Sequence, residues 1–463
     1  MTKPIKVVRP INPFTLEPVG EYPILDYTAL QSTINRARNA SKAWRKVDVG
    51  QRVEWLRAAL QYFEANRGSI VTDITQQMGK PIRQSENEVK GFFERAEYLI
   101  GSAESILSSE YLPAKAGFER RIEHVPLGVV LIIAPWNYPL LTAVNGVVTA
   151  LLAGNVVILK HSSLTPAVGE HFARAFGKLG PCEDILQAVL AEHSDLGRAI
   201  SECNIDHVVF TGSVEGGRTV QKAASSRFID CNLELGGKDG AYVASDADLE
   251  KATTDLVDGA MYNAGQSCCG IERVYVHQNL YSEFIERCET LAAEYRLGNP
   301  MEHKTTMGPL ASAKSAQEMS RQVEAAKAKG AKVICGGKAK LIGMGTFFEP
   351  TLITDVDNSM DVVREENFGP ILPILSVSSD EEAVRCINDS RYGLSSAIYT
   401  RDLDRANRFA MEAETGTVFM NRCDYLDPAL PWTGVRDSGR GTTLSKFGFY
   451  SLTRRKAIHF RLP

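Results

Sequence analysis

Helical patterns dominate the first hundred residues. Between residues 51 and 63, apolar side chains recur at intervals of three and four, at Val53, Leu56, Leu60 and Phe63. This spacing places them on one face of an amphipathic helix. A second helical stretch, rich in Glu and Ala, begins after Lys80-Pro81 and extends to about residue 105. We therefore expect a mainly helical N-terminal region.

After residue 128 the pattern changes to short, continuous apolar runs that alternate with amphipathic segments. Three runs precede residue 236 and five follow it: 129–133, 155–159, 207–210, 273–277, 332–335, 371–377, 396–399 and 416–420. Strands that are apolar on both faces and separated by helices are typical of a parallel sheet covered by helices. The sequence therefore predicts two α/β lobes, divided near residue 236.

Two further segments, residues 118–125 and 454–460, alternate polar and apolar side chains and do not look like core. Such patterning suits edge strands, which need a partner edge. We expect both segments to form a small arm.

Composition and charge exclude several classes of protein. The chain has 463 residues, of which 44% are hydrophobic and 23% charged, and its formal net charge is −4. These values are typical of a globular protein and lack the basic excess of a nucleic-acid binder. Nine cysteines without a Cys-x-x-Cys pair argue against a zinc site of clustered thiolates and for a reducing compartment. We expect neither nucleic acid nor a metal among its ligands.

Neither a leader nor a membrane span is predicted. Residues 1–6 lack the apolar core of a signal peptide. Residues 128–159 carry no charge, but prolines, asparagines and glycines such as Pro135, Asn137 and Gly154 interrupt them. This stretch reads better as strand, helix and strand than as a membrane helix. The sequence therefore predicts a cytoplasmic protein.

Four segments carry candidate chemistry: residues 134–139, 210–217, 233–238 and 263–269. Each also has an ordinary structural interpretation. Ser213 suits a helix N-cap, Glu234 could be the structural partner of another buried group, and Cys268 could be an inert core thiol. The dinucleotide fingerprint Gly-x-Gly-x-x-Gly is absent.

Taken together and in this order, the four segments resemble those of the aldehyde dehydrogenase superfamily. Residues 365–370 (Glu-Glu-Asn-Phe-Gly-Pro) and 430–439 extend the resemblance, with Trp432 where Phe is common in the family. The similarity covers nearly the whole chain. It implies an α/β fold with a Rossmann-like cofactor domain, a second α/β catalytic domain and a small β oligomerisation arm.

The resemblance implies a catalytic role for three residues. Cys268 would attack the aldehyde carbon as a thiolate, and the side-chain amide of Asn137 and the backbone N–H of Cys268 would hold the oxyanion. Glu234 would activate water to release the acid from the thioester. Relatives that pass the acyl group to coenzyme A typically lack this Glu, so its presence favours a hydrolytic enzyme.

The family's cofactor contacts fall, by position, on Trp136, Lys160, Ser163, Gly212, Ser213, Leu235, Glu366 and Phe368. Many NAD-preferring relatives carry Glu at the position of Ser163, where a carboxylate would repel a 2′-phosphate. We therefore expect NADP to be accepted, either preferentially or alongside NAD. The segment Lys160-His161-Ser162 is similar to that of a bacterial succinate-semialdehyde dehydrogenase branch.

One departure concerns Gly146, where many relatives carry a lysine of a proton relay to the base. Either water replaces that lysine here or Glu234 is tuned differently. The substrate is less well determined. By analogy, the aldehyde tunnel would be lined by Tyr138, Asn145, Ser267, Cys269 and Trp432. A semialdehyde would also need a cation, for which the candidates are Arg273, Arg422 and Arg436.

The resemblance predicts domains as well as an assembly. Residues 1–105 and 127–236 would bind NAD(P), 237–436 would be catalytic, and 106–126 and 437–463 would form the oligomerisation arm and C-terminal segment. A homodimer or homotetramer is expected. Two alternatives stay open: a dehydrogenase for medium aliphatic or aromatic aldehydes, and a non-catalytic binding protein on the same scaffold.

Overall fold

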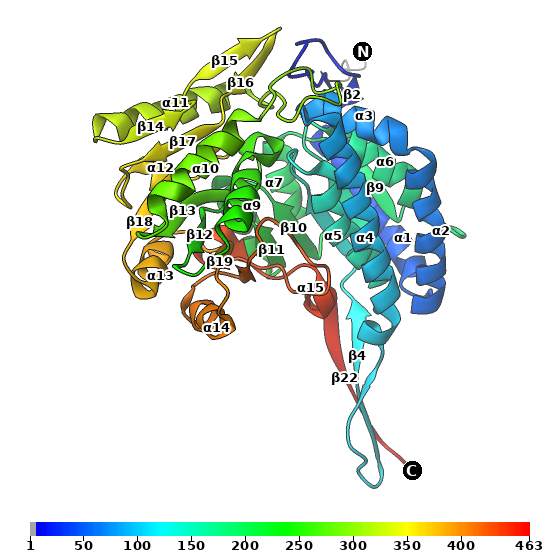
Figure 1. Ribbon diagram of the computed structural model, residues 1–463. Helices are drawn as coiled ribbons and strands as arrows, with labels where there is room; N and C mark the ends of the chain where they lie inside the picture. Colours follow the sequence, from blue (N-terminus) through cyan, green and yellow to red (C-terminus); the bar gives the residue numbers. More distant parts are fainter. Residues whose placement is uncertain (1–5) are drawn as a thin grey trace.

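The computed structural model describes residues 6–463 (Figure 1). The expectation about a leader concerns residues 1–6, of which 1–5 lie outside the described residues. After the short pair β1 (Val7–Val8) and β2 (Tyr22–Pro23) come α1 (Tyr27–Trp44), α2 (Val49–Ala65), α3 (Arg67–Met78) and α4 (Ile82–Leu107). The two expected helices lie within α2 and α4. Asp26 and Asp48 cap α1 and α2 through their side chains.

The first lobe is built on a six-stranded sheet with the order β21-β11-β10-β5-β6-β9. Its strands are β5 (Val129–Ile133), β6 (Val156–Lys160), β9 (Leu186–Val189), β10 (His207–Thr211), β11 (Asp230–Glu234) and β21 (Gly439–Arg440). All pair in parallel except β21, which is antiparallel to β11. The helices between the strands are α5 (Pro139–Leu152), α6 (Pro166–Phe176), α7 (His193–Glu202) and α8 (Val214–Ala224).

The strand order reverses between β5 and β10. From β5 the chain proceeds through β6 to β9 on one side, whereas β10 and β11 lie on the other. In open α/β sheets, ligands bind beyond the carboxyl ends of the strands at such a point. The segments that follow β5 and β10 are those that contain Asn137 and Ser213.

The second lobe contains a seven-stranded sheet with the order β14-β17-β18-β13-β12-β19-β20. Its strands are β12 (Asp239–Val243), β13 (Ile271–His277), β14 (Lys332–Cys335), β17 (Thr351–Thr354), β18 (Ile371–Val377), β19 (Ser395–Tyr399) and β20 (Thr417–Met420). Its helices are α9 (Leu249–Met261), α10 (Tyr281–Ala293), α11 (Ala313–Ala328), α12 (Asp361–Arg364), α13 (Asp380–Asn388) and α14 (Leu403–Glu412). The hairpin β15 (Ala339–Ile342) and β16 (Gly345–Phe348) lies beside this lobe (Figure 1).

A three-stranded sheet projects from the body of the molecule (Figure 1). It consists of β3 (Glu110–Tyr111), β4 (Phe118–Pro126) and the C-terminal β22 (Thr453–Arg461), which runs antiparallel to β4 over its whole length. The sequence had placed strands in both long segments. The rest of residues 437–463 packs elsewhere, because β21 extends the first sheet and α15 (Ser445–Ser451) contacts α4 and α5.

Two separate hydrophobic cores underlie the two lobes. The first extends from Leu30 to Leu235 and also takes in Phe449 and Leu452, whereas the second extends from Ala241 to Phe409. The predicted α/β class is confirmed; the domain boundaries stay a prediction. The uncharged stretch 128–159 folds as β5, α5 and β6. Within residues 6–463, no helix has the length and apolar character needed to cross a membrane.

Candidate active site

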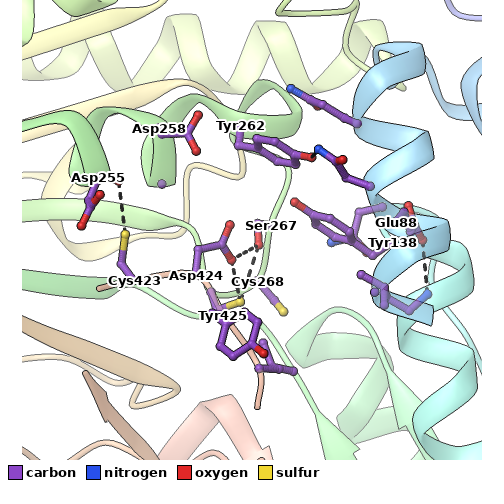
Figure 2. A pocket seen from close by; sticks show the side chains of 18 of the residues that line it. Glu88, Tyr138, Asp255, Asp258, Tyr262, Ser267, Cys268, Cys423, Asp424 and Tyr425 are labelled. Carbon is purple, nitrogen blue, oxygen red and sulfur yellow. Dashed lines mark hydrogen bonds between the residues drawn. The ribbon is translucent and has the colours of Figure 1, made fainter. Parts of the chain in front are cut away.

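A cavity of about 1480 Å³ lies between the lobes. Its lining includes the three predicted catalytic residues, Asn137, Glu234 and Cys268. Figure 2 shows Cys268 and Ser267 on one side of this cavity, with Tyr138 and Glu88 on the other, beside α4. Residues that are 34 to 131 positions apart in the sequence thus line one space, because each follows a strand or helix that ends at the cavity.

The loop that carries Cys268 leaves α9 through a kink. Asn263, Ala264 and Gly265 have φ angles of 54°, 54° and 69°, in the left-handed region. At Gly265 a Cβ atom would lie 2.2 Å from the carbonyl of Gly369, so only glycine permits this approach. The kink therefore joins the cysteine loop to residues 365–370.

Asn137 is attached to the same loop. Its side-chain Nδ2 donates a hydrogen bond to the carbonyl of Gln266, at 3.1 Å, and Asn263 donates to the carbonyl of Asn137, at 3.2 Å. An amide nitrogen carries two hydrogens, so one donor of Asn137 is fixed by the loop and the second is left for another acceptor. The contact holds a candidate oxyanion donor next to the candidate nucleophile.

Glu234 ends β11 and is partly buried. Thr211 donates to its Oε2, at 2.9 Å, and Thr443 donates to its Oε1. Burial raises the pKa of Glu234 above its ordinary value, while the two threonine hydroxyls act in the opposite direction. A carboxylate without an ion pair and with a raised pKa suits a general base near neutral pH.

Cys268 is half-buried, whereas its neighbour Cys269 is buried. Cys269 donates from Sγ to Asp424 Oδ1, at 3.0 Å. Ser267 donates to the same oxygen, at 3.1 Å (Figure 2). A side-chain hydrogen bond with Cys268, followed by burial and the charge of Asp424, raises the pKa of Cys269 well above its usual range. Of the two adjacent thiols, Cys269 is thus held as a thiol donor, and Cys268 is the more exposed one.

The residues predicted to meet the nicotinamide end of a cofactor lie close together. The rings of Trp136 and Phe368 are in edge contact, with centroids 5.7 Å apart. Glu366 accepts a hydrogen bond from the backbone of Gly237, at 3.0 Å. Burial raises the pKa of Glu366 to about 8.

A buried ion pair positions this group. Lys238 donates to Glu272, at 2.8 Å, and to Asn367, at 2.6 Å. Glu272 also accepts from the backbone N–H groups of Asn367 and Phe368, at 2.7 and 2.8 Å. The loop after α12 is therefore held by charge-assisted hydrogen bonds.

The remaining cofactor candidates fit a dinucleotide. Lys160 is 7% exposed, and its ammonium group has no hydrogen bond to any residue in 6–463. Ser213 caps α8, whose N-terminal N–H groups suit a phosphate, and Gly212 precedes it. Leu235 packs on Gly217 of the same helix, and Ser163 is exposed beside Lys160. A buried ammonium that has no partner within residues 6–463, at the end of β6, suits an anionic, hydroxylated ligand.

Gly146 lies on α5 against the sheet, where an added Cβ would come within 3.1 Å of Ile132. Thr211 and Thr443 bind the carboxylate of Glu234, and both explanations for the missing lysine stay predictions. Within residues 6–463 no group of three or more His, Cys, Asp or Glu is arranged to hold an ion.

The five residues expected in the aldehyde tunnel all line the cavity: Tyr138, Asn145, Ser267, Cys269 and Trp432. Of the candidate cations, Arg422 lies in the lining and is exposed. The predictions for Arg273 and Arg436 were wrong, because neither residue lines the cavity. Arg273 is bound to backbone carbonyls such as those of Lys238 and Ile387, and Arg436 is bound to Glu414 and to carbonyls.

Sequence reasoning missed Arg95 and Asp424, which both line the cavity. Arg95 could have been noticed, because it lies on the apolar face of the long α4 helix with Val89, Phe92 and Leu99. Asp424 stands in a loop with no periodic pattern, so its position gave no signal.

Comparison with known proteins agrees with this geometry. Residues 2–458 match the model of the aldehyde dehydrogenase family. The chain is 33% identical to the succinate-semialdehyde dehydrogenase (NADP⁺) of Deinococcus radiodurans, over 98% of this chain and 95% of the relative. It is also 33% identical to a succinate semialdehyde dehydrogenase (NAD(P)⁺) of Escherichia coli, over 95% of each chain. The lactaldehyde dehydrogenase structure from Escherichia coli has a TM-score of 0.95, at 29% identity, over 99% of this chain and 96% of that chain. The chain therefore belongs to the aldehyde dehydrogenase family.

Proposed function

We propose that this protein oxidises a small-molecule semialdehyde, such as succinate semialdehyde, to the carboxylic acid with NADP⁺ or NAD⁺. The observation that carries the proposal is the convergence of Cys268, Asn137 and Glu234 on one cavity, next to Trp136 and Phe368. The enzyme class follows from the family, and the relatives named above support both the cofactor and the substrate.

The first step is attack of the Cys268 thiolate on the aldehyde carbon, which forms a carbon–sulfur bond and leaves a tetrahedral oxyanion. Two donors are available for that oxyanion. One is the second N–H of Asn137, and the other is the backbone N–H of Cys268, which has no backbone acceptor within residues 6–463. Such donors typically contribute about 3 kcal/mol each to the transition state.

When bound, the nicotinamide of NAD(P)⁺ supplies the acceptor for the two electrons and hydrogen that leave the aldehyde carbon. Collapse of the oxyanion then leaves an acyl thioester on Cys268. Glu234 takes a proton from a water molecule, which attacks the thioester and releases the acid and the free thiol. The thiol is thereby restored for the next turnover.

We also propose that Ser163 permits NADP⁺. Its hydroxyl stands where a carboxylate would repel a 2′-phosphate, and Lys160 beside it supplies a positive charge. We further propose that the protein is cytoplasmic and forms a homodimer or homotetramer through the sheet of β3, β4 and β22, because β22 presents an unpaired edge.

The test is a panel of aldehydes assayed with both cofactors by absorbance of the reduced nicotinamide. We expect turnover of succinate semialdehyde, the highest kcat/KM with NADP⁺ or comparable values with both cofactors, and none in Cys268→Ser. If no aldehyde is oxidised, or if Cys268→Ser keeps full activity, the proposal is wrong. A better rate with a medium aliphatic or benzylic aldehyde would favour the alternative substrate class.

A further inference from the structure

Arg95 reaches the cavity from α4. It is 9% exposed and lines the same space as Cys268, Asn137 and Glu234. Its Nη1 donates to the carbonyl of Leu141, at 2.9 Å, and to Asn145 Oδ1, at 3.2 Å. Both acceptors belong to α5, so one nitrogen of the guanidinium is anchored and its direction is fixed.

The rest of this guanidinium has no partner within residues 6–463. Neither Nε nor Nη2 forms a hydrogen bond there, and no carboxylate oxygen lies within 4.0 Å of Arg95. Two other buried cations do have counter-ions, since Lys80 is paired with Glu88 and Lys238 with Glu272. A buried charge without a counter-ion is costly, and burial lowers the pKa of Arg95.

Three acids that line the cavity, Glu234, Asp424 and Glu88, are bound by other groups. Glu234 is bound by Thr211 and Thr443, and Asp424 accepts from Ser267 and Cys269. Glu88 is paired with Lys80 and also accepts from the backbone N–H of Leu140. The free edge of Arg95, formed by Nε and Nη2, is therefore an unused donor pair on a residue that lines the cavity.

We propose that Arg95 is a specificity-determining residue that binds the carboxylate at the far end of the substrate. The inference rests on the proposed function, because it assigns the distal group of the aldehyde that Cys268 attacks. The two N–H groups of the free edge match the two oxygens of a carboxylate in a bidentate arrangement. Asn145 and Leu141 hold that edge in place, and the bound anion supplies the missing counter-ion.

The test compares two substrates that differ in charge: succinate semialdehyde and its methyl ester. In Arg95→Met, we expect kcat/KM for the acid to fall by about 30-fold or more, through KM, because the anion loses its buried partner. The value for the ester should stay within about threefold. In Arg95→Lys, kcat/KM for the acid should fall less than in Arg95→Met, since lysine keeps the positive charge but lacks the planar guanidinium group.

The matched control is Lys90→Met, which removes an exposed positive charge from the same helix beside the same cavity. The kcat/KM of this variant should equal that of the wild type for both substrates. Circular dichroism and thermal melting establish that each variant is folded. A loss that is equal for acid and ester would contradict the inference and assign Arg95 a structural role, as would no loss for the acid.

A binding measurement separates this inference from the proposed function. Titration of the wild type with succinate alone should give saturable heat that Arg95→Met weakens by about tenfold or more and Lys90→Met leaves unchanged. If the wild type binds succinate in this way but oxidises no aldehyde, the proposed function fails and the anion site stands. If aldehydes are oxidised but succinate binds wild type and Arg95→Met equally, the inference fails alone.

Discussion

The pKa of the Glu234 carboxylate depends on its burial and on two neighbouring threonine hydroxyls. The carboxylate is partly buried, it has no ion pair within residues 6–463, and two threonine hydroxyls donate to it. Desolvation favours the neutral acid and the hydroxyls favour the anion, so the balance between them sets the pH at which the base is active.

Removing the Thr443 hydroxyl should therefore shift the pH profile. Burial already raises the pKa of Glu234, and loss of a donor to the anion raises it further. Because the base works only when deprotonated, activity falls as the pH drops through this pKa. In Thr443→Val, the acidic limb of the kcat profile should move to higher pH by about one unit.

The neighbouring Thr442→Val is the control, because Thr442 contributes only its backbone carbonyl to the bonds near the site. Its acidic limb should coincide with that of the wild type. An unchanged limb in Thr443→Val would show that a different group controls the profile.

A second prediction at this scale concerns the cofactor. Ser163→Glu places a carboxylate beside the ribose site, so kcat/KM for NADP⁺ should fall by about tenfold or more through repulsion of the 2′-phosphate. The value for NAD⁺ should stay equal or rise. Ser162→Glu, one position away, serves as a charge-matched comparison. Equal effects of Ser163→Glu on both cofactors would refute the role given to Ser163.

Among single residues, the sequence predicted the catalytic candidates but not the side chains that contact them. Cys268, Glu234 and Asn137 stand in recognisable segments, so their roles were predicted from the resemblance. Thr443 and Arg95 were not foreseen, because their contacts depend on how β21 and α4 pack against the first lobe. Arg273 and Arg436 were misplaced for the same reason, since sequence cannot tell a guanidinium bound to carbonyls from one that faces a cavity.

Among the elements, the kinked segment before Cys268 is the most constrained. Ala264 and Asn263 adopt left-handed backbone angles without being glycine, at a cost of about 1 kcal/mol or more each. The packing of Gly265 on Gly369 holds them there. The element that carries the nucleophile is thus positioned by the loop that also carries Glu366.

Gly265→Ala should disrupt this element. The new methyl group would meet the Gly369 carbonyl in an unfavourable backbone region, which should cost about 2 kcal/mol of stability or more and lower the melting temperature. Activity should fall with it. Gly68→Ala is the matched control, because its Cβ would meet no atom within 4 Å in a helix. A normal melting temperature for Gly265→Ala would contradict the proposed constraint.

Strands that carry their own apolar run were predicted well, and the others were not. The eight predicted runs lie within two residues of the observed strands β5, β6, β10, β13, β14, β18, β19 and β20. The sequence did not delimit β9, β12 and β17, which are four or five residues long, or the two-residue β21. Such segments become strands through pairing with neighbours rather than through their own pattern.

For the molecule as a whole, the projecting sheet is the element on which the proposed assembly depends. The nine-residue ladder between β4 and β22 lies away from both cores, and most side chains of β22 are exposed. A projecting sheet with an unpaired edge is stable when another chain covers it. The domain division near residue 236 stays a prediction.

Light scattering coupled to gel filtration should therefore give a mass of twice or four times the chain mass of 50.8 kDa. Deletion of residues 453–463 removes the outer strand of the sheet and should reduce this mass or cause aggregation. A monomer for the full chain at micromolar concentration would contradict the assembly proposed here.

The central claim is that Cys268 carries the acyl group and that Glu234 releases it, and intact-mass spectrometry of Glu234→Gln tests this claim most directly. After mixing with succinate semialdehyde and NADP⁺, the variant should form one equivalent of NADPH and retain the acyl group. Peptide mapping should place the added mass on Cys268, because the base that activates water is missing. An adduct on Cys269, or continued turnover at the wild-type rate with no adduct, would contradict the account.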